Sequence, residues 1–180
     1  MITSPLEAKE PTGLPDIKGF TGEYAFLSNF YPATIVHDDG VTYPTAEHAY
    51  QAQKTTNPTT KQKIASLPYP GAAKRYGAKL PLTEEWSWER YTVMDRVLML
   101  KFQDPVLQKR LLDTENARLV ETNFWGDVYW GVCNGTGANV LGTLLMSIRA
   151  RMQLILAQPM TQPIVGFGNP KDIISLELKP

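Results

Sequence analysis

The sequence predicts a single compact domain of the α+β class, mostly helical with a few short strands. Apolar residues recur at three- and four-residue spacing in the longer segments, which is typical of amphipathic helices. Residues of strand type occupy only short segments bounded by turn signals. A chain of 180 residues and 20.2 kDa is also large enough to bury one hydrophobic core.

The N-terminal half begins with strand and turn signals and continues with short helices. We expect residues 20–31 to form a strand and a loop, and residues 34–37 and 41–43 to form a hairpin closed by Asp38-Asp39-Gly40. Thr45 is a suitable N-cap for the first helix. Asn57-Pro58 ends that helix and caps the next, at 58–66, and a helical turn at 70–76 is closed by Gly77.

Two longer helices dominate the C-terminal half. Thr83 is expected to cap a helix at 84–103, whose apolar positions at helical spacing are Val93, Met94, Val97, Leu98 and Leu100. Asp104-Pro105 restarts a helix to residue 112, and residues 118–121 form a strand. Asn139 is expected to cap the last helix, at 140–157, with a buried stripe of Leu141, Leu144, Leu145, Ile148 and Met152. The tail is expected to add a strand at 173–178.

Three segments follow from composition: a flexible leader at 1–18, rich in proline and charge, a domain at 19–158, and a C-terminal extension at 159–180. The net charge is zero, from 18 basic and 18 acidic residues, which argues against binding nucleic acid mainly through its phosphates. No apolar run approaches the roughly 18 residues of a membrane span, and the N-terminus has no apolar signal core. We therefore expect an intracellular, soluble protein without a membrane partner.

Metals and common cofactors are not indicated. The single cysteine, Cys133, excludes an internal disulfide. With only His37 and His48 beside it, a dedicated zinc site is not expected. The chain has no GxGxxG or Walker pattern, so a standard dinucleotide or nucleoside triphosphate site is not supported. We predict no metal site and no cofactor.

The segment from Tyr43 to Lys54 carries a carboxylate and an amine at the start of a helix. Glu47 and Lys54 are seven positions apart, which places them within about 20° around a helix and roughly 10 Å apart along its axis. A carboxylic acid and an amine nucleophile on the same face of a helix are suited to chemistry at a sugar–nitrogen bond. The alternative is an ordinary amphipathic helix with solvated charges.

Residues 123–139 form an aromatic, glycine-rich and irregular segment that ends at a helix N-terminus. Its glycines permit close approach of the backbone to a ligand, its aromatic rings offer stacking faces for a base, and the helix start suits an anion such as phosphate. Asp127 lies among the aromatic residues. The alternative is a packed Ω-loop whose rings belong to the core.

Five motifs along the chain share one order with a known family. They are Phe26-Leu-Ser-Asn-Phe-Tyr-Pro32, Tyr43 to Lys54, Ala73-Lys-Arg-Tyr-Gly77, the helix with Trp86, Met94 and Lys101-Phe102, and a C-terminal signature with Leu119-Val-Glu121, Asp127-Val-Tyr-Trp-Gly131 and Gly135 to Gly142. Over residues 20–152 the chain resembles the NADAR family, also called YbiA-like domains. Ala78 and Asn134 depart from it, since the family often has Arg and Asp there.

The resemblance implies a small α+β fold and an N-glycosidase activity on ribose attached to an exocyclic amine. It implies two substrate types: ADP-ribose on the amino group of guanine, in nucleosides or DNA, and the ribosylamino-pyrimidine and ribosylamino-uracil phosphates of riboflavin synthesis. The partners expected from it are such a substrate, modified DNA without strong non-specific DNA binding, and a separate ADP-ribosyltransferase. A non-catalytic module that binds ADP-ribose or NAD is the alternative from another class.

Three residues are the catalytic candidates. Lys54 is hypothesised to form a Schiff base at the sugar C1 after ring opening, which requires burial or a neighbouring cation to lower its pKa. Glu47 is the general acid and base, and Asp127 orients the ribose hydroxyls or stabilises a cationic intermediate. The competing chemistry is direct attack by a water that Glu47 or Asp127 activates. The predicted substrate-binding residues are Ser28, Asn29, Phe30, Arg75, Trp86, Tyr129, Trp130, Gly131 and Asn139.

Overall fold

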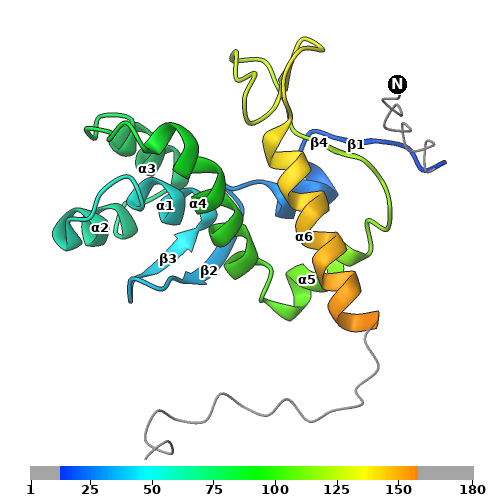
Figure 1. Ribbon diagram of the computed structural model, residues 1–180, viewed down its shortest axis with the longest axis horizontal. Coiled ribbons are helices and arrows are strands. Elements are labelled where there is room, and N and C mark those ends of the chain that lie inside the picture. Colours follow the sequence, from blue (N-terminus) through cyan, green and yellow to red (C-terminus); the bar gives the residue numbers. More distant parts are fainter. Residues whose placement is uncertain (1–12, 158–180) are drawn as a thin grey trace, which may run out of the picture.

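The computed structural model describes residues 13–157, and it confirms an α+β fold in which helices predominate (Figure 1). Its strands are short and pair two by two: β1 with β4, β2 with β3, and β5 with β6. In chain order the elements are β1 (Ile17–Lys18), a 3₁₀ helix (Gly22–Leu27), β2 (Pro32–Val36), β3 (Thr42–Thr45), α1 (Ala46–Ala52), α2 (Pro58–Ala65), α3 (Pro70–Gly77), α4 (Trp86–Lys101), α5 (Pro105–Leu112), β4 (Leu119–Val120), β5 (Thr122–Asn123), β6 (Val132–Cys133) and α6 (Val140–Ala157).

The predicted hairpin and the first helix are confirmed. Strands β2 and β3 are antiparallel, with Ile35 opposite Tyr43, and the turn between them lies at Asp38-Asp39-Gly40. The Thr45 hydroxyl accepts a hydrogen bond from the His48 amide and so caps α1. Because the cap fixes where the helix starts, it also fixes Glu47 in the first turn.

Helix α4 lies between two hydrophobic clusters, and this position explains its apolar pattern. Met94 and Leu98 pack with α5, α6 and the 3₁₀ helix, whereas Val97 and Leu100 pack with α1 and the hairpin. Figure 1 shows α4 between the side of the molecule that carries α1 and α3 and the side that carries α6. A helix buried on two sides needs apolar residues on both, as the sequence predicts.

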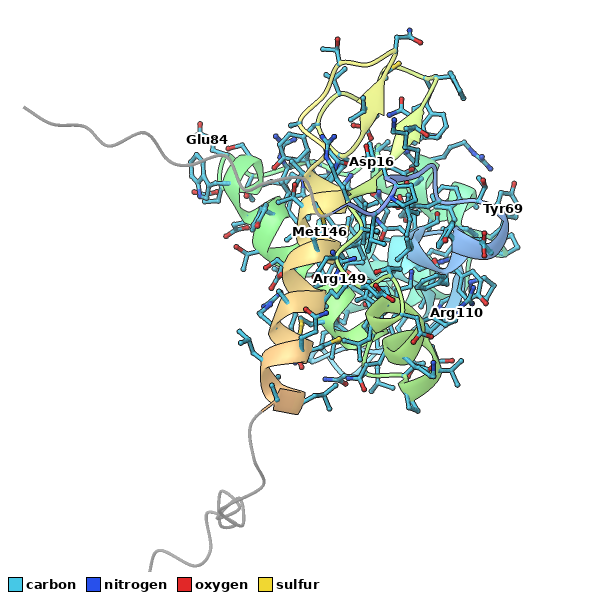
Figure 2. The ribbon with its side chains drawn as sticks, turned by 90° about the vertical axis from the view of Figure 1, so that its right-hand side faces the viewer. Asp16, Tyr69, Glu84, Arg110, Met146 and Arg149 are labelled. Carbon is cyan, nitrogen blue, oxygen red and sulfur yellow. The ribbon has the colours of Figure 1, made fainter. Side chains whose placement is uncertain are left out.

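Helix α6 is anchored along its length. The predicted stripe is buried: Leu141, Leu144, Leu145, Ile148 and Met152. Met146 and Arg149 lie along the same helix (Figure 2), and the Arg149 guanidinium donates to the Thr114 hydroxyl at 2.6 Å and to the Ala117 carbonyl at 2.9 Å. By length and mean hydropathy (1.4) α6 would suit a membrane span, contrary to the expectation that no such run exists, yet here its stripe is part of the domain core.

Several local predictions are wrong. Residues 22–27 form a 3₁₀ helix rather than a strand. The N-cap of α4 is Glu85, and no side chain caps that helix, so Thr83 is not its cap. Helix α1 ends at Ala52, and Lys54 lies in the turn that follows. The strand expected at 173–178 lies outside the described residues.

The boundary of the fold also differs from the expected leader at 1–18. Ile17 and Lys18 form β1, which pairs in parallel with β4, and Ile17 is buried in the core. The Ile17 amide donates to the Arg118 carbonyl at 2.8 Å. A two-residue strand has too little alternation for its pattern to be recognised in a sequence, which is why composition alone placed these residues in the leader.

Candidate active site

A cavity of about 430 Å³ opens between α1, α4 and the irregular segment at 123–139. Helix α1 contributes Glu47, Tyr50 and Gln51, and α4 contributes Trp86, Arg90 and Met94. The 28–30 loop, Lys54, Lys74 and the segment after β4 complete the wall. Glu47 and Lys54 therefore line one cavity with Asp127, which is distant from them in the sequence.

Glu47 lies on the α1 side of the cavity and is only 6% exposed. Its Oε1 accepts a hydrogen bond from Gln51 Nε2 at 2.8 Å, and its amide donates to the Asn29 carbonyl at 2.9 Å. Burial raises the pKa of this carboxyl, although the Gln51 bond and the charges of Lys74 and Lys54 oppose the rise. A carboxyl with a raised pKa takes up a proton more readily than a solvated one and can serve as an acid.

Gly77 makes the Gln51–Glu47 bond sterically possible. A Cβ at this position of α3 would collide with the Gln51 side chain, including the Oε1 and Cδ atoms of its amide. Only glycine lets α3 approach α1 this closely. The glycine that the sequence identifies as the end of a helical turn is therefore also part of the support for Glu47.

Lys54 lies just beyond the end of α1, and its ammonium faces aromatic rings. Its Nζ is 5.8 Å from the centre of the Tyr50 ring and 5.9 Å from the Trp86 ring. Burial and the charge of Lys74 lower the pKa of Lys54, while Glu47 opposes that shift. A burial effect and a neighbouring cation are what the amine needs to be partly neutral and nucleophilic.

Asp127 lies on the opposite wall and also organises the loop around it. Its Oδ1 accepts from the amides of Tyr129, at 3.1 Å, and Trp130, at 2.9 Å. The Asn123 side chain donates to the Asp127 carbonyl and accepts from its amide. One carboxylate oxygen of Asp127 is thus occupied by the backbone amides that shape the loop.

Glu121 is a cavity residue that the sequence does not identify as part of the site. Burial and the nearby charge of Asp127 raise its pKa to about 7, and Lys74 opposes the rise. Its Oε2 is buried and has no hydrogen-bond partner among the described residues. The signal available in the sequence is its position directly after strand β4, at the start of the aromatic segment.

The aromatic residues and the 28–30 loop complete the walls. Five of the predicted substrate-binding residues line the cavity: Ser28, Asn29, Phe30, Trp86 and Trp130. The Tyr50 ring lies 5.5 Å from the centres of both Trp86 and Trp130, which forms a continuous aromatic surface. Asn29 Oδ1 is a second buried acceptor without a partner in the described structure. These groups offer stacking faces and free acceptors to a ligand.

Four predicted binding residues lie away from the cavity wall. Arg75 donates to the Tyr69 hydroxyl at 2.8 Å, and Lys74 lines the cavity in its place. Tyr129 stacks under the Arg90 guanidinium at 3.6 Å.

Gly131 and Asn139 support the loop. A Cβ at Gly131 would collide with the Glu121 backbone. The side chain of Asn139 donates to the Leu119 carbonyl through Nδ2 and accepts from the Glu121 amide through Oδ1. Asn139 has φ +51°, and its side chain bonds Leu119 of strand β4 and not the first turn of α6. The predicted side-chain cap of α6 is therefore wrong. Both residues therefore act on the site by holding Glu121 in place.

The other singled-out residues have structural roles. His48 bonds Thr45 and the Leu67 carbonyl, and burial lowers its pKa. Cys133 lies in β6 and does not line the cavity. Within residues 13–157 no group of three or more His, Cys, Asp and Glu side chains is arranged to hold a metal ion.

Comparison with known proteins identifies the family. The NADAR domain model matches residues 18–153. The chain belongs to the NADAR family. It is 38% identical over 136 residues to "N-glycosidase YbiA" of Escherichia coli, a match that covers 73% of this chain and 84% of that protein. It is also 33% identical over 150 residues to "Riboflavin biosynthesis protein PYRR, chloroplastic" of Zea mays, covering 72% of this chain and 23% of that protein.

A solved structure of a relative confirms the fold. The chain superposes on the NMR structure of the E. coli protein YbiA with a TM-score of 0.72 and 33% sequence identity. The match covers 83% of this chain and 92% of that structure. The resemblance inferred from the five motifs is therefore confirmed, and the E. coli relative is a protein named an N-glycosidase.

Proposed function

We propose that this protein is an N-glycosidase that hydrolyses the bond between a ribose and an exocyclic amine, and that its main substrate carries ADP-ribose on the amino group of guanine. The observation that carries the proposal is the shared cavity of Glu47 and Lys54. The names of the relatives support the reaction class. The aromatic and cationic side chains of the cavity wall support the choice of substrate.

The geometry suits an imine route. An exocyclic N-riboside opens its sugar ring to an imine at C1, and the neutral amine of Lys54 adds to that carbon. As the bond between C1 and the base nitrogen breaks, the nitrogen keeps the bonding pair and takes a proton from a carboxyl group, and C1 stays bound to Lys54 as an imine. The free base amine leaves at this step. One water then hydrolyses the imine with Lys54, which releases the sugar, here ADP-ribose, and restores the lysine amine. Glu47, whose pKa burial raises, lines the same cavity as Lys54 and can exchange a proton with its amine.

The cavity wall offers the contacts that an ADP-ribosyl group on guanine requires. Trp86 and Trp130 present aromatic faces to a base. Lys74 and Arg90 place two cations on the wall, which suit a diphosphate. Trp125 is 67% exposed and lies 5.9 Å from the Lys74 ammonium, so it is available to stack on a second base at the entrance.

A second candidate substrate is a ribosylamino-pyrimidine or ribosylamino-uracil phosphate. The observation that favours it is the printed name of the maize relative, a riboflavin biosynthesis protein. Such molecules carry the same ribose–amine bond but have one base and one phosphate. They would engage Glu47 and Lys54 in the same way and leave Trp125 without a partner.

The test is a glycohydrolase assay of the full chain with both substrates. We expect release of ADP-ribose from ADP-ribosylated guanosine by the wild type, and at least ~100-fold less by Glu47→Gln and Lys54→Ala. Lys109→Ala is the matched control, because Lys109 is an exposed lysine of α5 that pairs with Asp113, and it should retain full activity.

Three other outcomes would change the proposal. Turnover of the ribosylamino phosphate alone would make that the substrate. Tight binding of ADP-ribose without turnover of either compound would show a binding module. Borohydride added during turnover should leave a mass adduct on Lys54, and active enzyme without that adduct would point to direct attack by water.

A further inference from the structure

We infer that Glu121 is a further catalytic residue of this site, the group that donates a proton to the departing base amine and then accepts a proton from the attacking water. The inference rests on the proposed function and assigns a role to a carboxyl outside the catalytic set of Glu47, Lys54 and Asp127. Its basis is the geometry of the wall that faces α1.

The backbone of Glu121 is held by two hydrogen bonds, and the residue lines the cavity. Its backbone amide donates to Asn139 Oδ1 at 3.0 Å, and its carbonyl accepts from the Val132 amide at 2.7 Å. Its Oε2 is buried yet has no hydrogen-bond partner within the described part of the chain. A buried acceptor that the protein leaves unpaired is costly unless a ligand or water completes it.

Asp127 cannot easily take this role, although it lies in the same wall. Its Oδ1 already accepts from the amides of Tyr129 and Trp130, so this oxygen holds the aromatic segment in place. The two charged groups placed against Glu121 are Asp127, which favours the protonated acid, and Lys74, which opposes it. Glu121, whose Oε2 is left without a partner among the described residues, is therefore the carboxyl that is free to exchange a proton with the substrate.

The two glutamates then divide the proton transfers between two sides of the cavity. Glu47 is electrostatically coupled to Lys54 and serves the amine that attacks C1. Glu121 starts as a neutral acid and gives its proton to the base nitrogen, which takes the electron pair of the broken C1–N bond. The resulting carboxylate removes a proton from the water that adds to C1, which restores the acid. One water is consumed and no oxidant or reductant is needed.

The experiment compares Glu121→Gln with wild type and with Glu115→Gln, an exposed glutamate of the α5–β4 connection, in the full chain. We expect Glu121→Gln to lower kcat about 100-fold with KM changed less than about threefold, and to remove from the pH–rate profile the ionisation near neutral pH. Glu115→Gln should match wild type. Melting curves show whether each variant folds.

A second measurement separates proton donation from positioning. Substrates whose departing amine is more acidic need less protonation, so the loss in Glu121→Gln should shrink at least tenfold with the best leaving group. A uniform loss with an unchanged pH profile would overturn the assignment and leave the proposed function intact, as would full activity of Glu121→Gln. A wild type that cleaves no N-riboside would overturn both.

Discussion

Two buried lysines of this domain resemble each other electrostatically and differ in what they can reach. Burial lowers the pKa of both Lys54 and Lys101, the latter to about 7. Lys54 lines the cavity beside Glu47, with its ammonium over two aromatic rings. Lys101, at the end of α4, is fully enclosed and donates to the Ser28 carbonyl at 2.7 Å. A depressed lysine pKa therefore marks burial, and access to the cavity distinguishes the catalytic candidate.

The surroundings of the two ammonium groups explain the difference. Lys101 Nζ lies 5.2 Å from the Phe102 ring and 6.0 Å from the Tyr31 ring, inside the core around the 28–30 loop. Its hydrogen bond to Ser28 positions a loop that lines the cavity without exposing the amine to a ligand. The positive charge of Lys74 acts on Lys54 and lowers its pKa further. A change at Lys74 should therefore change the pKa of Lys54.

The largest effect should come from removing Lys54, the member of this pair that lines the cavity. Lys54→Ala should lower kcat at least ~10³-fold, because it removes the amine that the proposed mechanism uses as the nucleophile. The variant should fold normally, since Lys54 lies in a turn and is only half-buried. Turnover assays and thermal melts of the purified chain check both statements, and a variant with more than a tenth of wild-type activity would place the nucleophile elsewhere.

Lys74 and Arg75 provide a smaller and more selective test. The two residues are adjacent and exposed on α3, yet only Lys74 lines the cavity. Removing the Lys74 charge should raise the pKa of Lys54, leave less neutral amine at neutral pH, and move the acid limb of the pH–rate profile to higher pH. We expect about a tenfold loss at pH ~7 in Lys74→Ala.

Arg75→Ala is the matched control and should stay within about twofold of wild type, because its guanidinium bonds Tyr69 outside the cavity. Kinetics over the neutral range check the pair. Equal losses in the two variants would show that α3 presents both cations to the substrate, contrary to the geometry.

These cases show what the sequence could predict about the site. Thr45 has one local partner three residues on, so the start of α1 and the direction of Glu47 follow from the sequence. Lys74 and Arg75 differ by about 100° around a short helix, and the phase of α3 against the cavity depends on tertiary packing. A lysine at a helix end is typically solvated, whereas tertiary packing buries Lys101 beside Ser28 and Tyr31.

The irregular segment at 123–139 was the hardest to predict. Asn134 and Gly135 have φ +49° and +81° and connect Cys133 to Thr136 through paired backbone hydrogen bonds, a tight turn that an Asn-Gly pair does indicate. The position of Glu121, unlike this turn, is not fixed by a local signal. It depends on contacts with Asn139 and Gly131, which are distant from Glu121 in the sequence. Local signals therefore identified the turns and aromatic rings but not the carboxyl that they surround.

The smallest effect on catalysis should come from Lys101→Met, which keeps the length and apolar stem of the side chain. We expect kcat within about threefold of wild type, and a modest rise in KM because the Ser28 carbonyl loses its donor. The clearer readout is stability. Since the folded-state pKa of about 7 lies below that of a solvated lysine, the folded state binds fewer protons than the unfolded state above pH ~7.

The unfolding free energy of wild type should consequently rise with pH relative to Lys101→Met, by on the order of 2 kcal/mol between pH ~7 and pH ~9. Below the folded-state pKa the two curves should run parallel, because the amine is then protonated in both states. Urea unfolding of both proteins at matched pH values measures this difference. Parallel curves over the whole range would mean that water reaches the Lys101 amine, and the contrast with Lys54 would then be lost.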